Sequence, residues 1–128
     1  MFAPRPARAV ERGSASVELV VLMPLLLLIL LCGVQGAVYY HASSLALAAA
    51  QEGARAAARE NGTLATGTSA ARAFVSDTAG DSLTAVTISG SRTAAIATIT
   101  VTGSSLSLVP GWTPTVQRSA SLPVERIT

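Results

Sequence analysis

The sequence has few of the residues that catalysis and metal binding require. Its 128 residues include one cysteine, one histidine and seven acidic residues, and all nine basic residues are arginine. An enzyme needs a nucleophile with a base, paired carboxylates or a metal cluster gathered in a pocket, and these few scattered side chains do not supply one. We therefore expect no enzymatic activity, no cofactor, no metal site and no small-molecule substrate. A net charge of +2 without a clustered basic face also argues against nucleic-acid binding.

Aromatic residues are scarce, at 4% of the chain, although half of the chain is hydrophobic. The apolar residues are therefore mainly alanine, valine and leucine, and the core outside any membrane should be thin. The single cysteine, Cys32, has no partner for an intramolecular disulfide.

One long apolar run is present near the N-terminus. No side chain from Leu19 to Val34 is charged or strongly polar, and only Gln35 interrupts the run before Tyr40. About 20 such residues are enough for a helix to cross a bilayer core. We expect a transmembrane helix over residues 14–40, in contact with membrane lipid, and an extracytoplasmic domain over residues 41–128.

The charges around this run predict its orientation. Residues 1–13 contain Arg5, Arg8 and Arg12 against one acid and form a basic leader, whereas the first charge beyond the run is Glu52. Because arginines near a membrane remain cytoplasmic, we expect a single-pass protein of the cytoplasmic membrane with its N-terminus inside and its C-terminal domain outside. A secreted protein with a cleaved signal peptide is an alternative, with residues 34–37 as a loose cleavage site.

The residues at the start of the run combine a glycine with a carboxylate. A carboxylate at the edge of a bilayer core is costly unless it is paired, so Glu18 calls for a partner. Cleavage after Gly13 would create an amino group on Ser14, four residues before Glu18 on the same helical face. Gly13 and Ser14 are therefore a candidate processing site and Glu18 a candidate assembly charge. The simpler alternative is that Gly13 only begins the helix and Glu18 reaches the interface near Arg12.

Pro24 lies inside the apolar run. A proline in a helix removes a hydrogen bond and clashes with the preceding turn, here freeing the carbonyl of Val20. We expect a helix kink at Pro24, which is either a harmless bend or a weak point used during assembly.

The segment RGSASVELVVLMPLLLLILLCGVQGAVYY, residues 12–40, resembles the N-terminal signature of the TadE-like family of pilus-assembly pseudopilins. In that family an Arg-Gly, small residues, Val-Glu, an aromatic, a short apolar run, a proline and a polyleucine run follow one another. Here these features fall on Arg12, Gly13, Val17, Glu18, Pro24 and Leu25 to Leu28. Leu19 stands where the family usually has the aromatic.

The resemblance implies a function as well as a processing step. A prepilin-type peptidase would cut after Gly13, as in type IV pilins, and other pilin or pseudopilin subunits would be partners. The protein would be a membrane-anchored minor pseudopilin that takes part in assembling a Tad-type, type IV-like pilus or secretion apparatus. The alternative is a single-pass, membrane-tethered extracytoplasmic binding module unrelated to pili.

The rest of the chain predicts an α+β fold. We expect one helix from Ser16 to Asn61, ended by Asn61-Gly62 in a left-handed conformation, and a second helix over residues 68–78 capped by Thr66 or Thr68. The fold is then a long N-terminal helix, transmembrane and then extracytoplasmic, packed on a small three-stranded antiparallel sheet, as in pilins.

Alternating apolar residues predict the three strands, over residues 82–90, 93–103 and 115–126. Residues 90–92 are the expected hairpin turn between the first two. Thr84, Val86 and Ile88 should share one face of the first strand, and Pro123 should mark the third as an edge or ending strand.

Aromatic residues near the membrane predict interfacial contacts. Tyr39, Tyr40 and His41 follow the apolar run and should form a belt at the membrane surface. Trp112, the only tryptophan, is either a lid over the apolar end of the sheet, a ring at the membrane interface, or a contact for a neighbouring subunit.

Overall fold

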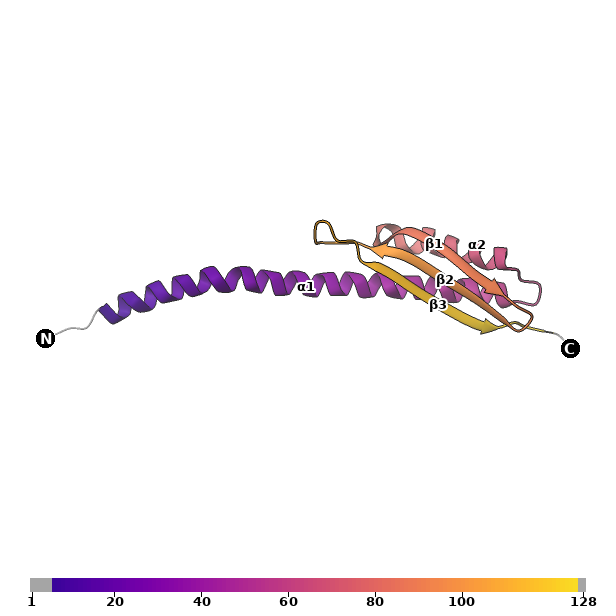
Figure 1. Cartoon of the computed structure of the whole chain (residues 1–128), viewed down its shortest axis with the longest axis horizontal. Coiled ribbons are helices and arrows are strands. Elements are labelled where there is room, and N and C mark those ends of the chain that lie inside the picture. Colours follow the sequence, from indigo (N-terminus) through magenta and orange to yellow (C-terminus); the bar gives the residue numbers. More distant parts are fainter. Residues whose placement is uncertain (1–5, 127–128) are drawn as a thin grey trace. The chain divides into compact units, whose positions relative to one another are not determined.

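The computed structural model describes the backbone of residues 6–126 and the side chains of residues 13–126. The chain forms the long helix α1 (Pro6–Ala58) and the shorter helix α2 (Leu64–Phe74), followed by a π-helical turn η1 (Val75–Ala79) and a 3-10 turn η2 (Gly80–Ser82). Three strands complete it: β1 (Leu83–Arg92), β2 (Ile96–Ser105) and β3 (Thr115–Pro123) (Figure 1). The first residues of the predicted leader, 1–5, lie outside the described part.

The chain divides into two compact units, residues 1–34 and 35–128. In the second unit, the C-terminal part of α1 packs on one face of an antiparallel sheet with strand order β1-β2-β3 (Figure 1). The predicted α+β fold, a long N-terminal helix packed on a three-stranded antiparallel sheet, is confirmed.

The core of the second unit is thin, as the composition predicts. The largest fully buried side chains are Ile99 and Val101 of β2 and Val116 of β3. They pack in one cluster with small residues of α1, which are Ala42, Ala46, Ala49, Ala50 and Ala54. These alanines recur at three- and four-residue spacing, so they form one continuous helix face that can approach the sheet closely.

Helices α1 and α2 cross at a pair of glycines. A Cβ atom on Gly53 would lie 2.8 Å from the carbonyl oxygen of Gly67 and 2.9 Å from the Cβ of Ala71. A Cβ on Gly67 would lie 2.6 Å from the Cβ of Ala57. Both positions therefore require glycine for close backbone approach.

Helix α1 ends earlier than predicted, at Ala58 rather than Asn61. Gly62 does not adopt a left-handed conformation. Instead, a Cβ on Gly62 would collide with the carbonyl oxygens of Ala56 and Ala57. The predicted reason for the helix end was wrong, because close packing rather than backbone handedness requires the glycine.

Helix α2 also differs from the prediction, because it begins at Leu64 rather than Thr68. Thr63 is its N-cap, with Oγ1 accepting a hydrogen bond from the backbone N–H of Thr66 at 3.0 Å. The predicted caps, Thr66 and Thr68, both lie inside the helix.

The first hairpin turn lies after the predicted one. Residues 90–92 belong to β1, and the turn is made by residues 93–95. Thr93 closes it, because its backbone N–H donates to the carbonyl oxygen of Ile96 and its Oγ1 accepts from the N–H of Ala95 and of Ile96. Gly90 is a strand residue that pairs with Ile99, and close packing requires glycine there because a Cβ would collide with the carbonyl oxygen of Thr98.

The prediction that Thr84, Val86 and Ile88 share one face of β1 is partly wrong. The register shifts between Thr84 and Thr87, and Ala85 has a positive φ of 51°. This bulge reverses the alternation of side chains, so Leu83 is buried, Thr84 is exposed, and Val86 packs against the core. Strand β3 ends at Pro123, three residues before the predicted end, and lies at an edge of the sheet as predicted.

Candidate functional site

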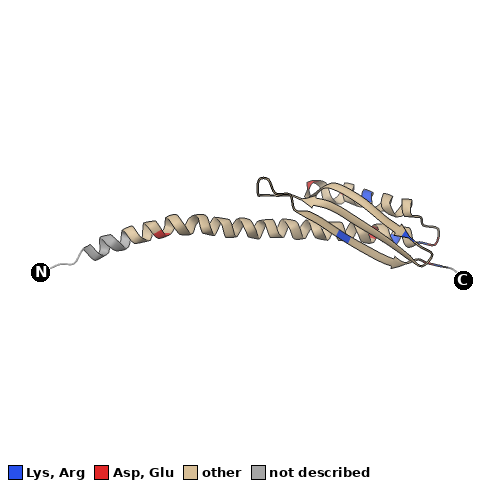
Figure 2. Ribbon diagram, viewed as in Figure 1, with Lys and Arg blue, Asp and Glu red and all other residues tan. Residues whose placement is uncertain are grey.

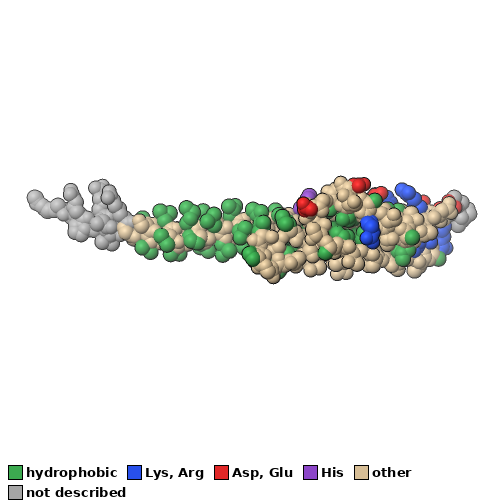
Figure 3. Space-filling model, turned by 90° about the horizontal axis from the view of Figure 1, so that it is seen from above, with side chains coloured by type: hydrophobic (Ala, Val, Ile, Leu, Met, Phe, Trp, Pro, Cys, Tyr) green, Lys and Arg blue, Asp and Glu red, His purple; other side chains and the backbone are tan. Residues whose placement is uncertain are grey.

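The apolar run lies on α1 with its side chains uncovered. Large hydrophobic residues from Val17 to Leu31 are each 40–72% exposed, and soluble monomeric proteins rarely expose a contiguous apolar surface of this size. Over residues 13–58 the helix is long and apolar enough to cross a membrane: its most apolar 18-residue window has a mean hydropathy of 2.8, and none of that window is buried. Figure 2 shows this run almost without charge, and Figure 3 shows hydrophobic side chains along it.

The predicted processing and assembly residues lie at the beginning of this run. Ser14 and Glu18 are one helical turn apart, and both are exposed. Among the side chains that the structure describes, residues 13–126, Glu18 takes part in no ion pair. Gly13 lies inside the helix, which begins at Pro6, and a Cβ at this position would meet no atom within 4 Å.

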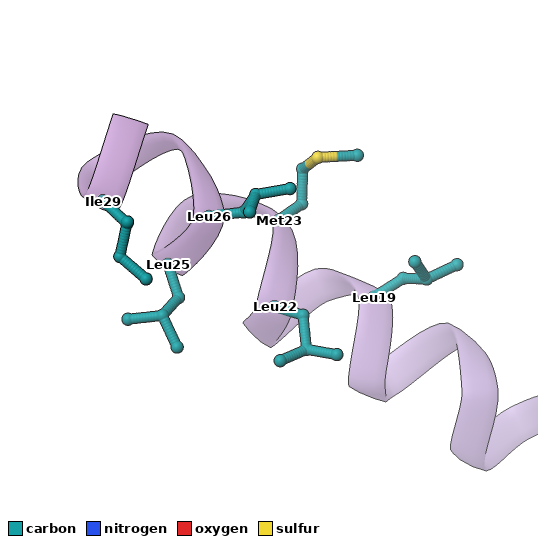
Figure 4. A pocket seen from close by; sticks show the side chains of 6 residues that line it. All are labelled: Leu19, Leu22, Met23, Leu25, Leu26 and Ile29. Carbon is teal, nitrogen blue, oxygen red and sulfur yellow. The ribbon is translucent and has the colours of Figure 1, made fainter. Parts of the chain in front are cut away.

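Pro24 is an interior residue of α1, and the helix continues through it. Beside it the helix surface has an open groove of about 360 Å³. The groove is lined only by the apolar side chains of Leu19, Leu22, Met23, Leu25, Leu26 and Ile29 (Figure 4). Such a surface can accept an acyl chain or the side chains of a neighbouring apolar helix, and it offers no group for catalysis.

Trp112 lies in the connection between β2 and β3, residues 106–114, which we call the β2–β3 loop. Its side chain is 51% exposed, so it is not a closed lid over the sheet. The backbone N–H of Trp112 donates to the carbonyl oxygen of Val109 at 3.3 Å. Gly111, with a φ of 80°, and Pro110 lie between them, which is the residue pattern of a type II turn.

Gln35 fastens the β2–β3 loop to α1. Its Nε2 donates to the carbonyl oxygen of Leu106 at 3.0 Å, and its Oε1 accepts from the backbone N–H of Leu108 at 2.7 Å. The Gln35 side chain is buried, and the Tyr39 hydroxyl donates to the carbonyl oxygen of Thr115 at 3.3 Å one turn further along α1. The amide thus satisfies two backbone groups of the loop at once.

The predicted residues fall in separate units. Gly13, Ser14, Glu18 and Pro24 belong to the first unit and Trp112 to the second. In the sequence, Gln35 stands out only as an interruption of the apolar run. A lone amide within such a run is a signal of a buried hydrogen-bonding role, although the sequence does not say which groups it binds.

The part of the chain with described side chains holds no group of three or more metal-binding side chains. Its one ion pair, Arg55 with Glu52 at 3.0 Å, joins exposed side chains on α1 and contributes little to stability.

Residues 13–55, about a third of the chain, match the family model described as TadE-like protein. The chain carries a TadE-like segment. The match begins at Gly13 and covers the apolar run, Gln35 and the alanine face of α1. It confirms the resemblance seen in residues 12–40. No curated protein and no solved structure matches the chain.

The TadE-like segment and the exposed apolar helix together fit a single-pass membrane protein associated with a Tad pilus. The segment covers neither α2 nor the sheet, so the match gives no information on these elements.

Proposed function

We propose that this protein is a minor pseudopilin-like subunit that is anchored in the cytoplasmic membrane and takes part in assembling a Tad-type pilus or secretion apparatus. The observation that carries the proposal is the exposed, uncharged helix of the TadE-like segment with Glu18 at its beginning. Other pilin or pseudopilin subunits are the partners. Residues 1–13 are the cytoplasmic leader, residues 14–40 cross the membrane, and residues 41–128 form the domain outside.

A prepilin-type peptidase removes the leader by cutting between Gly13 and Ser14. The new ammonium group on Ser14 then lies one helical turn from the Glu18 carboxylate, in the same chain or in a neighbouring subunit. Pairing these charges lowers the cost of holding a carboxylate at the edge of the hydrocarbon. The uncovered side chains around Pro24 give neighbouring helices an apolar surface to pack on.

The position of Gln35 supports retention of the helix after secretion. A signal-peptidase cut near residue 37 would separate Gln35 from the domain whose β2–β3 loop it holds. It would also cut through α1, which continues to Ala58. Both losses argue that the apolar helix stays attached to the domain.

Replacing the Glu18 carboxylate tests the proposed role. We expect Glu18→Ala to reduce pilus assembly at least tenfold, since an unpaired interfacial ammonium costs a few kcal/mol and about 1.4 kcal/mol corresponds to a factor of ten. Glu18→Asp, which keeps the charge, should retain part of the activity. The measurement is surface pilin sheared from cells of a deletion strain complemented with each variant.

The matched control is Glu52→Ala, which removes an exposed carboxylate from the same helix and should leave assembly unchanged. Equal amounts of each variant must be present in the membrane fraction. Normal piliation with Glu18→Ala would contradict the assembly role and favour a simple tether for a binding domain.

A further inference from the structure

We infer that the β2–β3 loop seats its apolar side chains in the surface of the bilayer, so the folded domain contacts the membrane at a second place besides its helix. The inference rests on the proposed function only in requiring that α1 cross a membrane. Its occupant is lipid, and it gives Trp112 an interfacial role rather than the subunit contact that the sequence also allowed.

The loop exposes more large apolar surface than its length would suggest. Leu106 is 53% exposed, Leu108 36%, Val109 40% and Trp112 51%, all within seven residues. Charged residues are absent from residues 93–117, which include the whole loop. Connections that face water are usually polar, so this composition indicates that the loop has an apolar partner.

The loop holds these side chains in a defined conformation. The backbone N–H of Ser105 donates to the carbonyl oxygen of Pro114 at 3.0 Å and closes the base of the loop. At the tip, the turn from Val109 to Trp112 fixes the chain through Pro110 and the positive φ of Gly111. In this conformation the apolar side chains of the loop are exposed and do not belong to the core.

Gln35 fixes the level of the loop along α1. Its amide binds the backbone of both Leu106 and Leu108, and Gln35 follows Val34, the last residue of the uninterrupted apolar run. The loop is therefore fastened to the helix at the residue where that run ends. If the run leaves the hydrocarbon near Gln35, the loop lies at the bilayer surface.

Two further properties favour lipid over protein as the partner. Tryptophan and tyrosine prefer the membrane interface, and exposed Tyr39 and Tyr40 lie within two turns of Gln35. The amide hydrogens of Leu108, Val109 and Trp112 all have acceptors, and prolines carry none, which reduces the cost of leaving water.

Because the loop itself carries no charge, its insertion should not depend on anionic lipid. Asp77 and Asp81 precede β1, whose first residue Leu83 pairs with Ser105 at the base of the loop. An anionic lipid surface would repel these two carboxylates. Vesicles of phosphatidylcholine alone are therefore the appropriate probe.

Trp112 is the only tryptophan, so its fluorescence reports on the loop without labelling. The full chain is reconstituted in phosphatidylcholine vesicles with and without bromine on the acyl chains near the headgroup. We expect a blue-shifted emission, quenching by the brominated lipid and protection from acrylamide in the water. Adding anionic lipid should leave all three unchanged.

A second reporter position supplies the control. The double variant Trp112→Phe with Asn61→Trp moves the tryptophan beyond the end of α1. Asn61 is exposed, and Ala58 lies 23 residues after Gln35, about 35 Å along the helix. This tryptophan should show red-shifted emission, full quenching by acrylamide and no quenching by brominated lipid.

The Gln35→Ala variant tests the fastening of the loop. Loss of the two amide hydrogen bonds should weaken the lipid quenching of Trp112. Gln51→Ala, which removes an exposed amide from the same helix, should not. Equal quenching in both variants would overturn the role given to Gln35.

An alkaline wash of the vesicles separates failure of the inference from failure of the proposed anchor. If the chain stays bound and Trp112 is quenched by acrylamide but not by lipid, the loop is in water and the inference is wrong. If Trp112 is protected from both quenchers, protein covers it and a subunit contact replaces the inference. If the wash releases the chain, the anchor itself is wrong.

Discussion

Single residues decide how closely α1 approaches its neighbours in the folded domain. Gly53 and Gly67 permit the crossing of the two helices, and the alanines of α1 permit packing on β2 and β3. The amount of alanine and the thin core could be predicted from composition. The crossing itself could not, because a glycine in a helix has the same sequence signature whether a neighbour touches it or not.

Two glycines of α1 provide a matched test of this packing. Gly53→Ala adds a methyl group within 3 Å of Gly67 and Ala71, and the overpacking cost of about 1–3 kcal/mol should outweigh the gain in helix propensity of about 1 kcal/mol. Gly36→Ala meets no atom within 4 Å and should be neutral or stabilising by about 0.5–1 kcal/mol. Thermal unfolding followed by circular dichroism in detergent micelles measures both.

The test is whether Gly53→Ala is less stable than Gly36→Ala. A Gly53→Ala variant as stable as Gly36→Ala would show that the helices do not approach each other at this crossing.

The sequence predicts helices and strands well where the hydrophobic pattern is strong. It predicts them poorly where a residue such as Gly90 fits both a turn and a closely packed strand. The apolar helix, the three strands and the edge position of β3 follow from hydrophobic pattern and from Pro123. The hairpin turn was misplaced because Gly90 has the sequence signature of a turn, whereas in the structure it is a strand residue under close contact. The bulge in β1 left no sequence signal, since Ala85 is an ordinary residue for a strand.

The end of α1 depends on contacts from distant parts of the chain. Arg92 donates from Nε to the carbonyl oxygen of Ala57 at 2.7 Å and from Nη2 to that of Arg59 at 3.4 Å. The backbone N–H of Glu125 donates to the carbonyl oxygen of Ala58 at 2.7 Å. These bonds satisfy carbonyl groups that a helix leaves free at its C-terminus, and the guanidinium complements the helix dipole.

Removing this cap should destabilise the domain without affecting the membrane helix. We expect Arg92→Ala to lower the free energy of unfolding by about 1–3 kcal/mol, since hydrogen bonds from a charged donor are lost. Arg72→Ala, an exposed arginine in the last turn of α2, should change it by less than about 0.5 kcal/mol. Urea unfolding of both variants in detergent micelles provides the comparison.

Equal midpoints for the two arginine variants would show that Arg92 of β1 does not cap α1.

At the scale of the whole molecule, the sequence contains the strongest functional signal. The apolar run, the basic leader and Glu18 could be recognised from residue types alone, and the TadE-like match covers the run and Glu18. The β2–β3 loop was harder to interpret because its meaning depends on Gln35, 71 residues away from Leu106 in sequence. Only folding brings that amide to the loop.

The central claim is that the mature protein begins at Ser14 and keeps its apolar helix. The most direct test is mass spectrometry of the N-terminal peptide from protein extracted from the membranes of its native host. We expect a mature chain that starts at Ser14 in wild-type cells and an uncut chain in cells lacking the prepilin-type peptidase. A chain that still starts near Met1 in wild-type cells, or one that starts near Ala37, would contradict it.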